Sequence, residues 1–415
     1  MSNFLANLTK SQRILVILIM AVVLYVISTA AAYSIFSSLG GRGGGGSEDL
    51  TASLPGPTEA FEEDPNEPRT EQCPIDGEMH TKKAKENWDF RRPLAVMIEN
   101  HTESRPQSGL TSADAVYEAV AEGGITRFMG VFYCNLSDVQ VGPVRSARTF
   151  FLDWASEYDP LYAHVGGANC TGGPGAPGCQ NGAPADALGQ IIKYGIKSLN
   201  QFGVGFPTYW RDYQRLGRPV ATEHTMYSTT KKLWEIGAKR GWTATDSAGI
   251  RWDKGFTPWK FMNEGDIKKA QADGSSAKAA TKIEVNFWNQ DGYKVDWYYD
   301  AACNCYKRTN GGQDHKDLNN DKQLSPRNVL VKFQKESRAN DGYEGNVHLL
   351  YANKGPQAPS GKALIFQNGK VIEGTWNKAN RLSREKFLTA GGIEITLVPG
   401  QIWLQTVPEG SSVTY

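Results

Sequence analysis

The sequence has almost no net charge and lacks the short motifs of several common enzyme classes. Its 45 Lys and Arg residues nearly cancel its 44 Asp and Glu residues, which leaves a formal charge of +1. No overall positive field therefore draws the chain to nucleic acid, and any recognition of an anion has to be local. The GxSxG elbow, the HExxH pair and the phosphate-binding P-loop do not occur. The enzyme classes that these motifs identify are accordingly not indicated.

Cysteine is scarce, and its spacing does not suit a metal. The six cysteines form no CxxC pair, and Cys303 and Cys305 alternate as they would on one face of a strand. An even number of cysteines agrees with a compartment in which disulfides persist. The segment between Cys170 and Cys179 is short and turn-rich, so these two are the best candidates for a disulfide. We predict no metal and no cofactor.

Charged residues are absent from residues 14–36, a run of 23 positions. As a helix, such a run crosses about 30 Å of hydrocarbon. Lys10 and Arg13 precede it, so the positive-inside rule keeps residues 1–13 in the cytoplasm. We predict a single-pass anchor in the cytoplasmic membrane, with the rest of the chain outside. A cleavable secretory signal ending near Ala30 is the alternative, and it exports the same body.

Composition divides the rest of the chain into four segments. Residues 37–85 are rich in Gly, Pro and Glu and are predicted to be a disordered linker. Strand-like and helix-like runs alternate over residues 86–261, which predicts an α/β domain with a mixed sheet. Residues 262–281 are predicted to be a connection. Short β-rich runs over residues 282–411 predict a smaller, mostly antiparallel domain, so the whole chain is α/β, or α+β overall.

Four local patterns give specific expectations for single elements. Residues 94–98 are uninterruptedly apolar, as in a strand covered on both faces. Residues 113–121 follow Ser112 as a helix follows its N-cap, and two glycines then end the run. Gln367-Asn368-Gly369-Lys370 predicts a hairpin with a type I′ turn, because Asn-Gly accommodates positive φ. Residues 393–398 are expected to form a late strand.

Several segments carry a family likeness. RPLAVMIEN, GLTSADAVYEAVAEGGITRF, VGPVRSAR and AHVGGA occur in this order, followed by TEHTMYSTTKKLW and GKALIFQNGKVIEGTW. Together they resemble the YerB-like bacterial envelope lipoproteins, whose two halves are domains of unknown function (DUF3048 N- and C-terminal). The resemblance implies a place in the cell envelope and a two-part architecture, but no reaction. This sequence departs from the family because no lipidated cysteine follows its apolar segment, so its predicted tether is the helix itself.

Two arginines in GPVRSAR make the most suggestive candidate for anion binding. Arg145 and Arg148 are three residues apart and are expected to precede or open a helix. On one helical turn they would share a face. With free backbone donors and the helix dipole they could bind phosphate or carboxylate, and Arg127 adds a third cation. The alternative is that these arginines pair with nearby acids such as Glu118, Glu122 or Asp153 and stabilise the fold.

Three further side chains, Glu99, Glu118 and His164, are candidates for catalysis, and Asn100 is a secondary candidate. Glu99, Asn100 and His164 follow predicted strands, and parallel strands would bring them to the sheet edge that carries Arg145. Glu99 or Glu118 could act as general acid or base, with His164 orienting the substrate. The same carboxylates could equally belong to a structural network with arginine.

Two histidines and one aspartate are secondary candidates. His224, His315 and Asp317 could bind a metal or transfer protons. A histidine in a loop is more often an ordinary hydrogen-bonding group. Asp317, Asn319 and Asp321 occupy the spacing of the first three ligands of a calcium loop. Lys322 and Asn328, however, stand where such a loop needs Gly and Glu.

These features predict an envelope protein that binds a cell-wall glycan or an anionic wall polymer. If the protein is an enzyme, it would also process this polymer. Local arginines and 11 tryptophans motivate this prediction. The expected partners are such a polymer or another envelope protein, together with the membrane through the N-terminal helix, and not nucleic acid. Two alternatives stay open: a non-catalytic interaction module, and a phosphotransferase that acts on lipid-linked wall precursors.

Overall fold

The computed structural model describes most of the chain beyond the predicted linker. The described residues are 63–135, 137–169, 186–272, 278–288, 290–338, 347–349 and 359–415. The predicted anchor at 14–36 and the predicted disulfide between Cys170 and Cys179 lie outside them. Among the described residues, no helix is long and apolar enough to span a bilayer.

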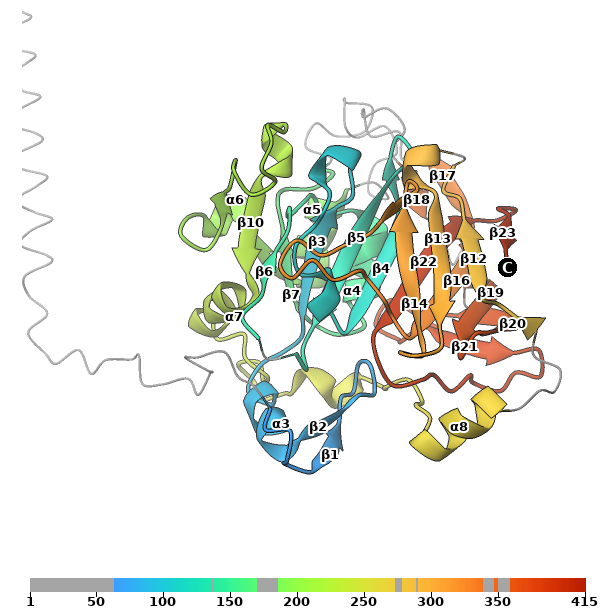
Figure 1. Ribbon diagram of the computed structural model, residues 1–415. Coiled ribbons are helices and arrows are strands. Elements are labelled where there is room, and N and C mark those ends of the chain that lie inside the picture. Colours follow the sequence, from blue (N-terminus) through green and yellow to red (C-terminus); the bar gives the residue numbers. More distant parts are fainter. Residues whose placement is uncertain are drawn as a thin grey trace, which may run out of the picture. The chain divides into compact units, whose positions relative to one another are not determined.

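The largest element of the fold is an 11-stranded mixed sheet (Figure 1). Its parallel pairs are β16–β22, β22–β4, β3–β7 and β7–β8, and its other pairs are antiparallel. In spatial order its strands are β11 (Lys278–Ala279), β20 (Lys370–Asn377), β19 (Ser360–Gln367), β16 (Asn328–Gln334), β22 (Ile402–Pro408), β4 (Ala115–Glu122), β5 (Ile125–Phe132), β3 (Leu94–Glu99), β7 (Leu161–His164) and β8 (Lys197–Asn200), with β21 (Lys386–Thr389) paired to β20.

A second sheet is five-stranded and entirely antiparallel. Its order is β15 (Gln313–Asp314), β14 (Cys305–Asn310), β13 (Val295–Asp300), β12 (Lys282–Val285) and β23 (Val413–Thr414). It packs on the main sheet through Trp297, whose ring lies 5.5 Å from that of Trp403 and whose Nε1 donates to Gln405 at 3.0 Å.

The remaining elements are short. The described helices are α3 (Lys82–Trp88), α4 (Thr149–Ala155), α5 (Ala187–Tyr194), α6 (Gln201–Val204), α7 (Thr230–Lys239) and α8 (Glu264–Ala272). Two small sheets are two-stranded: β1 (Arg69–Gln72) pairs with β2 (Met79–Thr81), and β17 (Glu336–Arg338) pairs with β18 (Val347–Leu349). A three-stranded sheet has β10 (Met226–Thr229) between β6 (Gln140–Val141) and β9 (Trp210–Arg211). The 3₁₀ helices are η1 (Thr102–Ser104), η2 (Leu110–Ser112), η4 (Thr222–His224), η5 (Trp252–Gly255) and η6 (Asp291–Tyr293).

These sheets confirm the predicted class, a mixed α/β fold with a β-rich second part. Strands from both predicted domains join in the main sheet, because β22 lies between β16 and β4 and pairs with both (Figure 1). Residues 55–415 form one compact unit. The described residues of the predicted connection at 262–281 belong to this unit.

The helix predicted over residues 113–121 is wrong, because this segment is strand β4. Every residue of β4 except Glu122 is buried, so the strand shows no alternation of apolar and polar positions. Gly123 and Gly124, expected to end a helix, form the turn into β5 with positive φ. The strand expected over 393–398 is also wrong, since only isolated bridges form there, at Glu394 and Leu397.

Other local predictions are confirmed. Residues 94–98 form the fully buried strand β3. Asn368 and Gly369 both have positive φ in the turn between β19 and β20, as a type I′ hairpin requires.

In the described part, Cys73 is bonded to Cys134, and Cys303 is bonded to Cys305 across the turn that precedes β14.

Candidate functional site

The candidate site lies at the edge of the main sheet where β3 and β7 end. The two strands are parallel, so Glu99 and His164 reach the same edge, as predicted. The segment that contains Arg145 crosses this edge and pairs with both strand ends. The Arg145 amide donates to Met97 at 2.9 Å, and its carbonyl accepts from Val165 at 3.0 Å. The backbone itself therefore fixes the position of Arg145.

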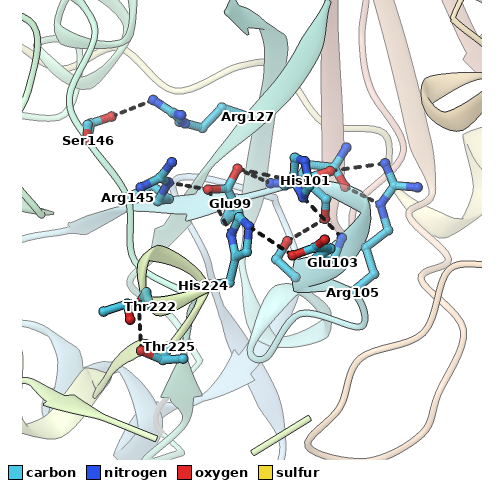
Figure 2. A network of polar contacts seen from close by, with 12 residues as sticks. Glu99, His101, Glu103, Arg105, Arg127, Arg145, Ser146, Thr222, His224 and Thr225 are labelled. Atoms are coloured by element: carbon cyan, nitrogen blue, oxygen red, sulfur yellow. Dashed lines mark hydrogen bonds and ion pairs between the residues drawn. The ribbon is translucent and has the colours of Figure 1, made fainter. Parts of the chain in front are cut away.

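Glu99 is the central acid of the site, and its side chain is only 1% exposed. One oxygen, Oε2, forms an ion pair with Arg145 Nε and lies 3.6 Å from His224 Nδ1 (Figure 2). The other oxygen accepts from the Asn100 and His101 amides, both at 3.2 Å. Burial alone would raise the pKa of Glu99, but His224 and two arginines hold this pKa well below its usual range. Glu99 is therefore an anion at neutral pH and a poor proton donor.

Glu122 joins the other two arginines of the cluster. One of its oxygens pairs with Arg127, and the other accepts from Arg148 at 2.7 Å. Burial works against ionisation, yet Arg127 and Arg148 lower the pKa of Glu122. We call Glu99, Glu122, Arg127, Arg145 and Arg148 the arginine cluster. Its three guanidinium groups and two carboxylates leave one excess positive charge.

The two arginines precede a helix, which is one of the two placements that we predicted, and they do not share a helical turn. Helix α4 begins at Thr149, and Arg148 has extended backbone at φ −133° and ψ 150°. Both Arg145 and Arg148 therefore precede the helix. The expected pairing with acids is found for Glu122 but not for Glu118, which lies apart from the cluster.

Glu118 is fully buried, and protein donors occupy both of its carboxylate oxygens. Oε1 accepts from Thr126 at 3.0 Å and from Arg308 at 2.9 Å. Oε2 accepts from Trp403 at 3.0 Å and from Gln405 at 2.9 Å. The geometry therefore favours a structural role for Glu118 over the catalytic role that we predicted.

The buried contacts of Glu118 continue through His315 back to the site. Arg308 Nε donates to His315 Nδ1 at 2.9 Å, so the Nε2–H of His315 faces Gln107 Oε1 at 2.7 Å. Burial and then Arg308 lower the pKa of His315 well below its usual value, which keeps it neutral. Gln107 in turn donates to Asn100 Oδ1 at 3.0 Å. His315 and Asn100 thus connect the interior to the candidate site.

Asp317 also has a structural environment. Its carboxylate accepts from the amides of Gly109 and Thr111, from the Thr111 hydroxyl at 2.9 Å and from the Asn319 amide at 2.9 Å. These bonds tie the loop before η2 to the second half of the chain. They leave Asp317 poorly suited to bind a metal.

His164 reaches the predicted edge, but its ring bonds elsewhere. Nδ1 contacts the Gly166 carbonyl at 2.6 Å, and Nε2 contacts Ser198 Oγ at 2.8 Å. Burial lowers the pKa of His164 to about 4, so the ring is neutral at physiological pH. It lines a cavity of about 630 Å³ with Leu188, Trp242 and neighbouring residues, and no contact joins it to Glu99.

His224 does belong to the site, together with two residues that the sequence analysis missed. Its ring stacks on that of His101 with centroids 4.7 Å apart and planes 12° apart. His224 Nε2 lies 3.9 Å from Glu103 Oε2 (Figure 2). A signal was present, because acid and imidazole alternate at Glu99, His101 and Glu103 directly after a predicted strand.

Comparison with known proteins matches two family models to two successive parts of the chain. The model described as "Protein of unknown function (DUF3048) N-terminal domain" matches residues 80–243, and the DUF3048 C-terminal domain model matches residues 283–404. The chain belongs to the DUF3048 family. It is 27% identical over 340 residues to "Putative lipoprotein YerB" of Bacillus subtilis (strain 168), covering 81% of this chain and 86% of that protein.

A solved relative shares the fold. The crystal structure of YerB protein from Bacillus subtilis matches with a TM-score of 0.63 at 24% identity, covering 83% of this chain and 100% of that one. The N-terminal DUF3048 region supplies the whole arginine cluster and both stacked histidines. The C-terminal region supplies Arg308, His315 and Asp317. Arg308 contacts His315, His315 contacts Gln107, and Asp317 accepts from the Gly109 amide.

Proposed function

We propose that this chain is a membrane-anchored extracytoplasmic protein that binds an anionic cell-wall polymer or glycan at the arginine cluster. The lipoprotein name of the Bacillus relative and the apolar run at residues 14–36 support the location. The two tethers differ in kind, an acyl chain in a lipoprotein and a helix here. Both would hold the body outside the cytoplasmic membrane.

The observation that carries the proposal is the state of Arg145. Its side chain is 24% exposed, and only Nε is used by Glu99. Within the described residues, no protein acceptor contacts its two Nη groups. A guanidinium fixed at one nitrogen and open at the other two presents a fork that matches phosphate or carboxylate. The excess positive charge of the cluster favours an anion at this position.

An exposed aromatic side chain near this edge suits a sugar. Phe202 is 78% exposed, and its ring lies against Gly166, just beyond the end of β7. Phe206 is exposed to a similar extent. Aromatic faces of this kind stack on sugar rings. By contrast, Tyr209 is buried, and Trp210 is covered by Lys232 at 4.7 Å.

The geometry favours binding over proton transfer. Glu99 is ionised and paired, Glu118 is occupied by four donors, and His164 bonds to Ser198 and Gly166. None of these groups is poised as a general acid. Processing of the polymer, and phosphoryl transfer through Asp317, accordingly gain no support from these contacts.

The test is retention of the full-length chain, kept in detergent, on isolated cell-wall material. The wild type should be retained, and Arg145→Gln should lose most of its retention because the open fork is removed. The matched control is Arg69→Gln, which removes a half-exposed arginine from β1. Wall material stripped of phosphate-linked polymers separates recognition of phosphate from recognition of glycan. Failure of the wild type to bind either material, or equal binding by Arg145→Gln, contradicts the proposal.

A further inference from the structure

Two histidines and one glutamate converge beside Glu99 from distant parts of the chain. His101 and Glu103 come from the loop that follows β3, and His224 ends the 3₁₀ helix η4 before β10. One ligand atom from each lies within 4.8 Å of the others. Two imidazole nitrogens and a carboxylate oxygen form the donor set that zinc-type ions prefer.

The backbone holds these three residues in place. Ser104 donates to the His101 carbonyl through both its amide, at 2.9 Å, and its hydroxyl, at 2.7 Å, which closes the tight turn of η1. Arg218 donates to the Glu103 carbonyl at 2.7 Å. On the other side, β10 lies against the Arg145 segment, because the Val144 amide donates to Met226 at 2.7 Å. The side chains therefore meet without any rearrangement of the loops.

His224 lies between two carboxylates in a way that orients its ring. Its Nδ1 faces buried Glu99 at 3.6 Å, and its Nε2 faces Glu103 at 3.9 Å. A carboxylate behind one ring nitrogen fixes the tautomer and turns the lone pair of the other nitrogen forward. Here that nitrogen faces Glu103, while the ring of His101 lies stacked alongside the ring of His224. Arg145 holds the same Glu99 oxygen from the opposite side.

We propose that His101, Glu103 and His224 bind a divalent transition-metal ion of the zinc type, with Glu99 as a positioning residue for His224. Ligand atoms around tetrahedral zinc are roughly 3.3 Å apart. The Glu103 side chain is 53% exposed, so a change of its rotamer can bring its carboxylate closer to the two histidine nitrogens. Three protein ligands leave a fourth position for water or a substrate oxygen, as in catalytic zinc sites.

This metal site does not depend on polymer binding at the arginine cluster. The ion would bind through imidazole and carboxylate, whereas the polymer would bind through guanidinium groups. The only shared residue is Glu99, which contacts both Arg145 and His224. Metal binding can therefore fail while wall binding succeeds, and the reverse also holds.

The experiment measures zinc binding by the full-length chain in detergent after removal of metal with EDTA. Titration calorimetry with zinc chloride, and metal analysis after gel filtration, should give about one ion per chain. Glu103→Gln and His101→Asn should each weaken binding about 10-fold or more, and Glu99→Gln about 10- to 100-fold through loss of orientation. The control is Glu223→Gln, which removes an exposed carboxylate next to His224 and should bind like the wild type.

Two results would overturn the metal site. One is a wild type that binds no zinc above millimolar affinity. The other is zinc binding that survives unchanged in both Glu103→Gln and His101→Asn. Neither residue is buried, so these variants keep the fold, and a thermal melt of each variant verifies this. Retention on wall material gives an independent readout in the same samples.

Discussion

Glu118 lies on β4 in the main sheet, and four hydrogen-bond donors contact its carboxylate. Its four acceptor bonds come from Thr126, Arg308, Trp403 and Gln405, and the guanidinium of Arg308 also lies 4.7 Å from the ring of Trp403. Removing one partner of a buried ion pair leaves the other charge unpaired, which is costly.

We predict that Glu118→Gln lowers the free energy of unfolding by about 3–5 kcal/mol. The amide group of Gln would have to face a donor, and the charge of buried Arg308 would lose its counterion. Urea unfolding measures the change. The exposed substitution Glu223→Gln should change stability by less than about 0.5 kcal/mol. A loss of under about 1 kcal/mol for Glu118→Gln would mean that the pair contributes little.

A second residue-scale effect concerns pH. Burial raises the pKa of Asp114 to about 6, even though the amides of Cys134 and Tyr133 and the charge of His80 act against this rise. Burial and the charge of Asp114 also raise the pKa of Asp76. These two carboxyl groups therefore hold more protons in the folded chain than in the unfolded chain, for Asp114 between roughly pH 4 and pH 6. Their contribution to stability falls as pH rises through this window and then stays lower.

We predict that Asp114→Asn removes part of this pH dependence. The Asn carbonyl can still accept from the Tyr133 and Cys134 amides, while the cost of a buried charge disappears. Melting temperatures measured from pH 4 to pH 8 should fall less steeply in the variant, with a gain at pH 7 on the order of 2 kcal/mol. An unchanged slope would assign the dependence to other groups.

Part of the site was predictable because it depends on strand ends. Glu99 and Arg145 meet because Glu99 ends β3, which an apolar run reveals, and the segment that contains Arg145 pairs with that strand end. The meeting of His224 with His101 depends on how the long segment before β10 folds back, and no local pattern encodes that. The Glu118 network was not predictable either, because three of its four partners, Arg308, Trp403 and Gln405, are distant in the sequence.

At the scale of elements, the hairpin between β19 and β20 depends on the conformation of one glycine. Gly369 has φ +69°, and a Cβ at this position would lie 2.7 Å from the Tyr299 ring. We predict that Gly369→Ala costs about 2 kcal/mol or more, from strain and overlap together. Gly392→Ala is the control: its φ is +76° with nothing within 4 Å, so strain alone should cost about 1 kcal/mol. Equal losses in urea unfolding would contradict the contribution of Tyr299.

The same scale explains which elements the sequence reveals. The turn at Asn368 and Gly369 was predicted because its chemistry is local. Strand β4 was mistaken for a helix because both of its faces are buried, so its alanines and valines carry no period of two. Burial on both faces is a property of the assembled sheet and not of the segment.

At the scale of the whole molecule, β22 joins the two halves. It pairs in parallel with β16 over Ile402–Pro408 and with β4 over Ile402–Thr406. We predict that a chain ending at Gly400 loses cooperative unfolding, because the main sheet is divided at its centre. A chain ending at Gly410 removes only β23 and should keep a single transition. Near-ultraviolet circular dichroism during urea unfolding distinguishes these outcomes, and a cooperative transition in the shorter chain would contradict the prediction.

The late position of β22 in the sequence also affects when the protein can fold. Until β22 has been synthesised, β4 and β16 have no partner between them, so the nascent chain exposes strand edges that invite association. Early folding is therefore disfavoured while the chain is still emerging from the ribosome. A polypeptide that stays unfolded until β22 has been synthesised can still pass through a secretion channel that accepts only unfolded chains.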